Sequence, residues 1–203
     1  MKRNLIALAV AAAFIAPVAN AAPKVYGKIN ISAESMKAET GGVSTEKTQM
    51  TSNASRFGVK GEDELTANLS AIYGIEWEVT AEGDGTDLGQ RNRFLGLKHQ
   101  SLGTVKMGRF DSYLKEAQGK VDLFNDYAGD MKYTIAAENR LNNVLAYESP
   151  KFMNTEFNVM AQTQDAASAG TSLSIVHSNE DMGLYVALAS DMGIEGKSAL
   201  FGS

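Results

Sequence analysis

The fold of this chain is decided by residues 91–131, RNRFLGLKHQSLGTVKMGRFDSYLKEAQGKVDLFNDYAGDM. Apolar and polar side chains alternate over residues 90–98 and again over 104–110, with a short turn between the two runs. A period of two predicts two antiparallel strands joined by that turn. Residues 111–138 then form a long segment that is acidic near its far end. Apolar residues at roughly helical spacing predict a short helix around 113–122 inside this loop.

The same alternation continues on both sides of this stretch. It is clearest over residues 69–81, where apolar side chains occupy one face and Ser, Glu and Thr occupy the other. Residues 38–51 are rich in Gly, Thr, Ser and Lys and are predicted to form a loop. The pattern predicts an all-β chain whose other strands are residues 25–34, 54–62, 140–148, 156–164, 171–178 and 183–190, with the start of one more before Ser203.

The first 21 residues predict a secretory signal peptide. Lys2 and Arg3 precede an almost unbroken apolar run, and the small residues at 19–21 form a cleavage site. A transmembrane anchor is the alternative, but the run is shorter than the ~20 residues that span a bilayer. We therefore expect a signal peptide at 1–21 and one β-barrel domain at 22–203.

Composition excludes several classes of protein. Removing Lys2 and Arg3 leaves 17 of the 19 basic residues against 24 acidic ones, a net charge of −7. A nucleic-acid binder is normally basic, so no nucleic-acid partner is expected. There is no Cys, so an exported protein of this sequence has no disulfide framework. No Cys/His metal cluster and no phosphate-binding loop is evident, so we expect no cofactor and no metal.

Strand length and the placement of loops favour a membrane barrel over a soluble sandwich. Strands of roughly 9–12 residues, with short turns on one side and longer loops on the other, fit a transmembrane β-barrel. A soluble sandwich usually has shorter strands. Nine or ten strands without a closing strand would leave an open edge in lipid. We therefore expect this chain to be the N-terminal part of a longer protein.

Several motifs carry a resemblance to a known family. The chain resembles the trimeric general-diffusion porins of the Gram-negative outer membrane, of the type found in β- and γ-proteobacteria. The resemblance runs from Val25 to about Ser190, and it rests on the order and spacing of the motifs rather than on any one of them. The motifs are VYGKI at 25–29, SRFGVKGEDEL at 55–65, RFLGLK at 93–98, GTVKMGR at 103–109 and NNVLAYESP at 142–150.

The resemblance implies a fold, partners and an activity. The fold is a transmembrane antiparallel barrel of 16 strands, of which this chain supplies nine to ten, with the third loop folded inward. The implied activity is passive diffusion of small hydrophilic solutes and ions, not enzymatic catalysis. The implied partners are two further copies of the chain, outer-membrane lipid and lipopolysaccharide, and the diffusing solutes. The chain ends in Ser203 and lacks the C-terminal aromatic residue of the family.

The family places basic side chains on the barrel wall at its constriction. The matching positions here are Lys28 of YGK, Arg56 of SRFG, Arg91 at the start of RNRFLGL and Arg140 in RLNNV. Each lies on the polar face of its predicted strand. Arg93 is predicted to share a face with Arg91 and is a weaker candidate. The alternative is that all are solvated surface charges, as most Lys and Arg are.

The family also places acidic side chains on the inward loop. The matching residues are Asp122, Asp126 and Asp130 in DLFNDYAGD, and Glu116 is a weaker candidate. Their four-residue spacing puts the three on one side of a turn or short helix. An ordinary exposed acidic loop is the alternative. Like charges so close repel one another, which nearby arginines would relieve.

Three other functions stay open at this point. A solute-specific channel often has a track of aromatic residues along its lumen. Here the inward faces are predicted to carry Tyr26, Tyr185 and little else aromatic, whereas Tyr73, Trp77, Phe94 and Phe157 are predicted to face outward. An outer-membrane enzyme needs a nucleophile with an oriented base, and neither His99 nor His177 has an evident Ser partner. A soluble exported β-domain that binds a ligand is the third.

Overall fold

The computed structural model describes residues 22–41, 43–83, 88–119, 121–127, 129–133, 138–163, 170–194 and 197–203. The signal peptide predicted at 1–21 lies outside these residues. Within the described ranges, no helix is long enough and apolar enough to cross a membrane. Strands dominate the described chain, which confirms the predicted all-β class.

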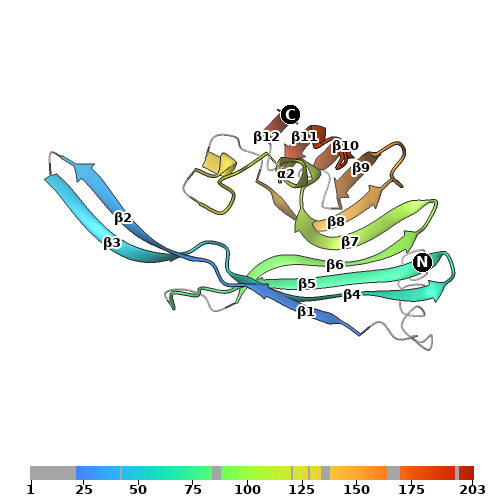
Figure 1. Cartoon of the computed structure of the whole chain (residues 1–203), viewed down its shortest axis with the longest axis horizontal. Helices are drawn as coiled ribbons and strands as arrows, with labels where there is room; N and C mark the ends of the chain where they lie inside the picture. The colour runs from blue at the N-terminus through green and yellow to red at the C-terminus, as the bar shows by residue number, and fades with distance from the viewer. Residues whose placement is uncertain are drawn as a thin grey trace.

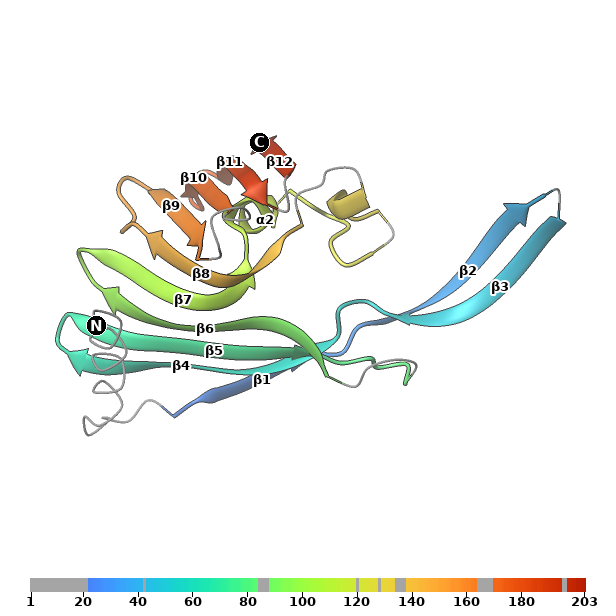
Figure 2. The ribbon, with the colours of Figure 1, turned by 180° about the vertical axis from the view of Figure 1, so that it is seen from behind.

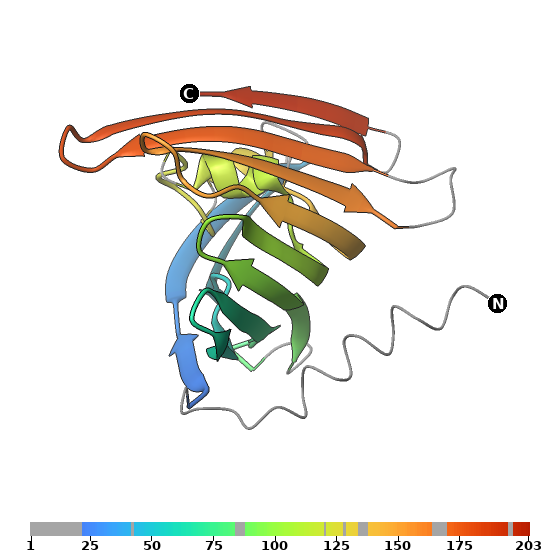
Figure 3. The same cartoon turned by 90° about the vertical axis from the view of Figure 1, so that its right-hand side faces the viewer.

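Ten strands form one antiparallel sheet in the order β1-β4-β5-β6-β7-β8-β9-β10-β11-β12. From β4 onward each strand pairs with the next one along the chain. The sheet curves around a concave inner face, and β1 and β12 are its two edges (Figures 1 and 3). The strands are β1 (Lys24–Lys28), β4 (Arg56–Thr66), β5 (Leu69–Glu78), β6 (Gly89–His99), β7 (Gly103–Asp111), β8 (Arg140–Glu148), β9 (Thr155–Gln162), β10 (Thr171–Asn179), β11 (Leu184–Ile194) and β12 (Lys197–Gly202).

Short turns and long connections lie at opposite ends of this sheet. The turn between β4 and β5 and the turn between β6 and β7 lie at one end, which we call the short-turn end (Figure 1). The β2–β3 hairpin and the segment between β7 and β8 extend from the other end, the long-loop end, as Figure 2 shows from behind. This separation agrees with the prediction, except that only two residues join β11 and β12 at the long-loop end.

The single strand predicted over residues 25–34 is wrong. The chain leaves the sheet after β1 and enters a separate hairpin, β2 (Ile31–Thr40) and β3 (Val43–Ser52), before β4 returns to pair with β1. Two hydrogen bonds stabilise this exit: the buried Ser55 Oγ accepts the Asn30 backbone N–H at 2.9 Å, and the Asn53 backbone N–H donates to the Asn30 carbonyl at 2.8 Å. The backbone groups released from the sheet are therefore hydrogen-bonded elsewhere.

The loop predicted at residues 38–51 is also wrong, because most of it is this hairpin. Gly41 takes a φ of +60° at the turn, a conformation that favours glycine. Side chains described on both strands are mostly exposed. A ribbon that meets water on both faces needs no apolar face, so hydrophobic alternation does not reveal it.

The two faces of the main sheet differ in character. Register places apolar side chains opposite one another on the outer face, for example Ile75 against Val59 and Met107 against Leu145. Exposed residues of this outer face include Val25, Phe57, Ile75, Leu97, Val105, Met107, Leu145, Tyr147, Phe157, Ile175, Val186 and Leu188. The inner face carries the charged side chains described below. An exposed apolar face opposite a polar one is the arrangement of a membrane barrel wall.

Phe94 does not face outward as predicted. It lies opposite Gly74 in register, and a Cβ on Gly74 would meet the Phe94 ring at 2.8 Å. Its ring stands edge-on to Phe110 on the inner face, with ring centroids 6.3 Å apart. A register shift between β5 and β6, described below, explains the change of face.

The connection between β7 and β8, which we call the inward loop, begins with α2 (Tyr113–Gln118). Ser112 caps this helix, since its Oγ accepts the Lys115 N–H at 3.3 Å. The helix lies inside the curve of the sheet against β9 to β12 (Figure 3), where Leu114 and Ala117 pack with Ala187, Ala189 and Phe201. It is shorter than the predicted 113–122, and the 3₁₀ turn η1 (Met131–Tyr133) follows later in the loop.

Gly58 allows β1 and β5 to pack closely around β4, and its replacement tests this packing. A Cβ there would lie 2.7 Å from both the Ile75 carbonyl oxygen and the Tyr26 ring. We expect Gly58→Ala to lower the free energy of unfolding by about 1–3 kcal/mol through overpacking. Urea unfolding of the full-length protein in detergent, followed by the mobility shift of the folded form, measures this. Gly202→Ala is the control, because its nearest neighbour lies 3.8 Å away. Equal midpoints for both variants would contradict the packing described.

Candidate functional site

The inward loop reaches across the concave face to the opposite wall at Asp126. The carboxylate of Asp126 lies 3.4 Å from Lys28 Nζ and 3.6 Å from Arg56 Nη1. Lys28 on β1 and Arg56 on β4 are directly opposite in register. Two like charges side by side repel, so a carboxylate between them stabilises both. This contact therefore joins three of the seven residues predicted for the site.

A neighbouring contact holds this crossing in place. The Tyr127 hydroxyl donates to Asn30 Oδ1 at 3.0 Å, where the chain leaves β1. Asp126 itself takes a φ of +73°, which few non-glycine residues adopt outside tight turns. The loop therefore turns sharply at the point where its carboxylate meets the wall.

Asp122 and Asp130 have a different position from Asp126. Their side chains are 8% and 3% exposed, and they accept backbone N–H groups of the loop itself. Asp122 accepts from Phe124 at 3.2 Å and from Met131 at 3.4 Å, and Asp130 accepts from Asp126 at 3.0 Å and from Lys132 at 2.8 Å. The four-residue spacing does not place them on one side of a helix, because α2 has ended at Gln118. They stabilise the loop from within.

The pKa of Asp130 reflects this environment. Burial acts against its charged form, but the N–H groups of Lys132 and Asp126 and the Lys132 ammonium outweigh burial and lower the pKa. Hydrogen bonds to a carboxylate favour its ionised state. Asp130 is therefore a charged acceptor around which the loop folds.

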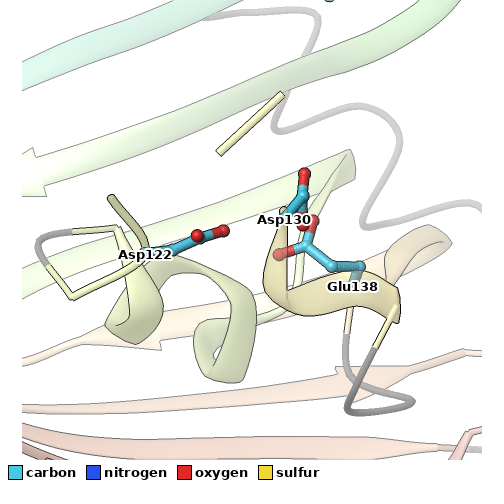
Figure 4. Close-up of side chains that lie close together, drawn as sticks. All are labelled: Asp122, Asp130 and Glu138. Atoms are coloured by element: carbon cyan, nitrogen blue, oxygen red, sulfur yellow. The ribbon is translucent and has the colours of Figure 1, made fainter. Parts of the chain in front are cut away.

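Asp122, Asp130 and Glu138 form an acidic cluster within the loop. Figure 4 shows the three side chains converging, and one oxygen from each lies within 4.8 Å of the others. Such a group has the ligands of a hard cation. However, the aspartates already accept the loop N–H groups, Lys132 lies 3.3 Å from Asp130, and Lys115 pairs with Glu138. Donors of the protein therefore account for the cluster.

Glu76 connects several basic residues of the wall and was missing from the predicted site. Its carboxylate lies 2.5 Å from Arg91 Nε and 3.8 Å from Arg56 Nε, and it accepts the Tyr26 hydroxyl at 2.9 Å. Arg91 also lies 3.3 Å from Glu78. The signal was present in the sequence, since alternation over 69–81 puts Glu76 on the polar face.

Arg91 lies on the inner face, but Arg93 does not share that face as predicted. The register between β5 and β6 shifts between Ile75 and Trp77, which adds a residue to β6. Arg93 is consequently opposite Ile75 on the outer face, with its guanidinium 5.9 Å from the centre of the Trp77 ring. A bulge moves every residue on one side of it to the other face relative to simple alternation.

Arg140 lies at the start of β8 and pairs with Asp111. The distance from Arg140 Nε to Asp111 Oδ1 is 2.8 Å, and the same nitrogen donates to Asn92 Oδ1 at 2.7 Å. Arg91 and Arg140 are largely enclosed, with side chains 12% and 14% exposed. They line one hollow between loop and wall, together with Glu78, Asp126 and Asp130. Asp122 does not line it, and Glu116 lines a separate hollow beneath α2.

A second contact that sequence reasoning missed fixes the root of the inward loop. Lys106 Nζ lies among three rings, 4.7 Å from the centre of Phe110, 5.5 Å from Tyr113 and 5.7 Å from Phe94, and it pairs with Glu148. A cation enclosed by aromatic faces is stabilised by their quadrupoles. The Tyr113 hydroxyl also donates to Glu148 at 3.1 Å, and burial raises the Tyr113 pKa. The ammonium therefore joins β7, β8 and the helix.

Comparison with known proteins identifies the family of this chain. The signature of the family described as Gram-negative porin matches residues 7–199. A major outer membrane protein P.IB of Neisseria meningitidis serogroup B is 33% identical over 175 residues, covering 82% of this chain and 51% of that protein. A P.IB of Neisseria gonorrhoeae is 27% identical over 199 residues, covering 93% and 56%. The chain spans about half the length of the curated relatives it matches.

Solved structures share the fold. An anion-selective porin from Comamonas acidovorans matches with a TM-score of 0.68 and 16% identity, covering 90% of this chain and 61% of that chain. Salmonella typhi OmpF in complex with daunomycin matches with a TM-score of 0.59 and 20% identity, covering 83% and 53%. At these identities the likeness concerns the fold alone.

Removing the Asp130 carboxylate tests its role within the loop. We expect Asp130→Ala to leave two N–H groups and Lys132 unpaired, at a cost of about 1–3 kcal/mol for a buried donor. Local opening should then speed tryptic cleavage after Lys132 by roughly tenfold. The control, Asp181→Ala, removes a carboxylate from the exposed β10–β11 turn. Mass spectrometry of the fragments from the folded full-length protein gives both rates, and equal rates would contradict the structural role of Asp130.

Proposed function

This chain belongs to the Gram-negative porin family, and on that premise we propose that the full-length protein forms a water-filled channel through the outer membrane. The channel admits small hydrophilic solutes and ions by passive diffusion and catalyses no reaction. The observation that carries the proposal is the contact of Asp126 on the inward loop with Lys28 and Arg56 on the wall. This contact narrows the space enclosed by the sheet and lines the narrowing with charge.

The physical basis of such a channel is the cost of desolvation. A polar solute that crosses ~30 Å of hydrocarbon loses its hydrogen bonds to water, at several kcal/mol for each group. A sheet with an apolar outer face and a charged inner face removes that cost, since the solute stays hydrated on the inner side. Selection then depends on the width and the charges of the narrowest point.

Charges of opposite sign face one another across the hollow between loop and wall. Arg91 and Arg140 belong to the wall, and Asp126 and Asp130 belong to the loop. Glu78 of the wall and Lys115 and Lys132 of the loop also line the hollow. We propose that Lys28, Arg56, Arg91 and Arg140 act on the passing solute from the wall and that Asp126 acts from the loop. Asp122 and Asp130 act indirectly by holding the loop in shape. A transverse field of this kind orients water and dipolar solutes and disfavours apolar ones.

The exposed outer face also bears on the partners of the protein. Large apolar side chains such as Val25, Leu97, Leu145 and Leu188 are 46–76% exposed on that face. Apolar patches of this extent need a covering. We propose that outer-membrane lipid, including lipopolysaccharide, covers one part and that the neighbouring subunits of a homotrimer cover another.

The charge on Asp126 is tested by ion selectivity in planar bilayers. We expect Asp126→Asn to shift the permeability of the full-length channel toward anions, by up to about fivefold, since a unit charge 4 Å away contributes ~1 kcal/mol in water. The variant with both Lys28→Gln and Arg56→Gln should shift it toward cations. The reversal potential in a salt gradient reports both changes.

Two controls separate the parts of the proposal. Asp181→Asn removes the same charge from the exposed β10–β11 turn and should leave selectivity unchanged. If Asp126→Asn conducts with unaltered selectivity, the channel stands but Asp126 does not lie at its constriction. If folded, membrane-inserted wild-type protein gives no conductance, the channel itself is refuted.

A further inference from the structure

One charged residue of the hollow between the inward loop and the wall comes from neither of them. The base of the β2–β3 hairpin also lines this hollow, through Glu34, Met36 and residues 51–54. The hairpin and the inward loop leave the sheet at the same end, as Figure 2 shows. Glu34 and Met36 share one face of β2, because successive side chains of a strand alternate between its faces. The hairpin therefore places a carboxylate on the long-loop side of the hollow.

Hydrogen bonds within the hairpin hold the Glu34 carboxylate in place. Its Oε1 accepts the Ser32 hydroxyl at 2.7 Å, and its Oε2 accepts the Thr51 hydroxyl at 3.3 Å. Ser32 Oγ in turn accepts the side-chain amide of Asn53 at 2.9 Å, and Asn53 is buried. Both donors to Glu34 are neutral hydroxyls, so they orient the carboxylate without cancelling its charge.

Glu34 differs in its pairing from the other charged residues of the hollow. Each of the others has a partner of opposite charge: Arg91 with Glu78, Arg140 with Asp111, Lys115 with Glu138, Lys132 with Asp130, and Asp126 with Lys28 and Arg56. Lys47 lies on the same face of the hairpin, opposite Met36. Neither Lys47 nor any other basic residue that the structure describes forms an ion pair with Glu34. The field of an unpaired carboxylate extends over about a Debye length, ~10 Å at 0.1 M salt.

We propose that Glu34 is a specificity-determining residue of the channel, which draws cations into the hollow from the long-loop side. This role rests on the proposed channel function and adds the hairpin to the wall and the inward loop as an element that acts on the solute. A fixed charge at the entrance of a narrow aqueous passage raises the local concentration of counter-ions. The favoured solutes are small cations, including the ammonium group of a zwitterion.

The ion selectivity of the full-length channel in planar bilayers tests this role. Glu34→Gln keeps the length of the side chain and one acceptor oxygen but removes the charge. We expect it to lower the permeability of K⁺ relative to Cl⁻ by roughly two- to fivefold at about 0.1 M KCl. The shift should nearly disappear at about 1 M KCl, where the Debye length is ~3 Å. Glu34→Asp should retain most of the wild-type selectivity.

The matched control is Glu39→Gln. It removes the same charge from the same strand, on the opposite face and at an exposed position that does not line the hollow. We expect this variant to keep the wild-type selectivity at both salt concentrations.

A single thiol tests the same position in channels that are already folded and inserted. The 203 residues contain no Cys, so Glu34→Cys introduces one reactive thiol into this part of the protein. Its thiolate attacks a methanethiosulfonate reagent, forms a disulfide and releases methanesulfinate. The negatively charged sulfonatoethyl reagent should restore the preference for cations, and the positively charged trimethylammonioethyl reagent should move selectivity further toward anions. The same reagents should leave Glu39→Cys channels unchanged.

The outcomes separate this role from the channel itself. If Glu34→Gln conducts with wild-type selectivity at low salt, or if both reagents leave Glu34→Cys channels unaltered, the channel stands and the role of Glu34 is refuted. An equal shift in Glu39→Gln would be a general effect of charge on the hairpin and would also overturn the proposal. Wild-type protein that is folded and inserted but does not conduct refutes the channel, and this role with it.

Discussion

Backbone pairing between neighbouring strands is the constraint on which the rest of this structure depends. Each ladder fixes which face every side chain occupies, so the alternation of the sequence becomes an apolar outer face and a charged inner one. The same pairing brings like charges together, as with Lys28 opposite Arg56. These adjacent basic residues are therefore stabilised by carboxylates from other parts of the chain. Glu76 comes from the neighbouring strand, and Asp126 comes from a loop 98 residues away from Lys28 in sequence.

The need for those carboxylates explains how the inward loop is built. Its root is fixed by apolar packing of Leu114 and Ala117 and by Lys106 among aromatic rings, so the loop leaves the wall in a defined direction. Its middle folds around the buried carboxylates of Asp122 and Asp130. Between these two residues, the Asp126 carboxylate points away from the loop and contacts Lys28 and Arg56 on the wall. The position of the Asp126 charge thus depends on two buried carboxylates that hold the loop in shape.

Much of this fold was predictable from period-two alternation, and the errors share one physical cause. Alternation assigns faces correctly as long as every residue advances the ladder by one. It placed Lys28 and Arg56 on the right face, but it failed for Arg93 and Phe94 beyond the shift between β5 and β6. It also missed the β2–β3 hairpin, whose strands have no apolar face. The site was harder still, because four-residue spacing implies a helix, and the aspartates lie in turns after α2 has ended.

The register shifts that make simple alternation fail also determine which basic side chains lie on each face of the sheet. The shift in β6 lets Arg91 turn inward to Glu76 while Arg93, two residues on, turns outward to Trp77. The register shift between β7 and β8 sends Asn142 toward Arg109. A regular ladder would put both arginines of β6 on one face. It would thereby either add Arg93 to the inner face beside Arg91 or move Arg91 away from Glu76, its closest partner. The shift in β6 therefore places Arg91 on the inner face, where Glu76 meets it, and Arg93 on the outer face against Trp77.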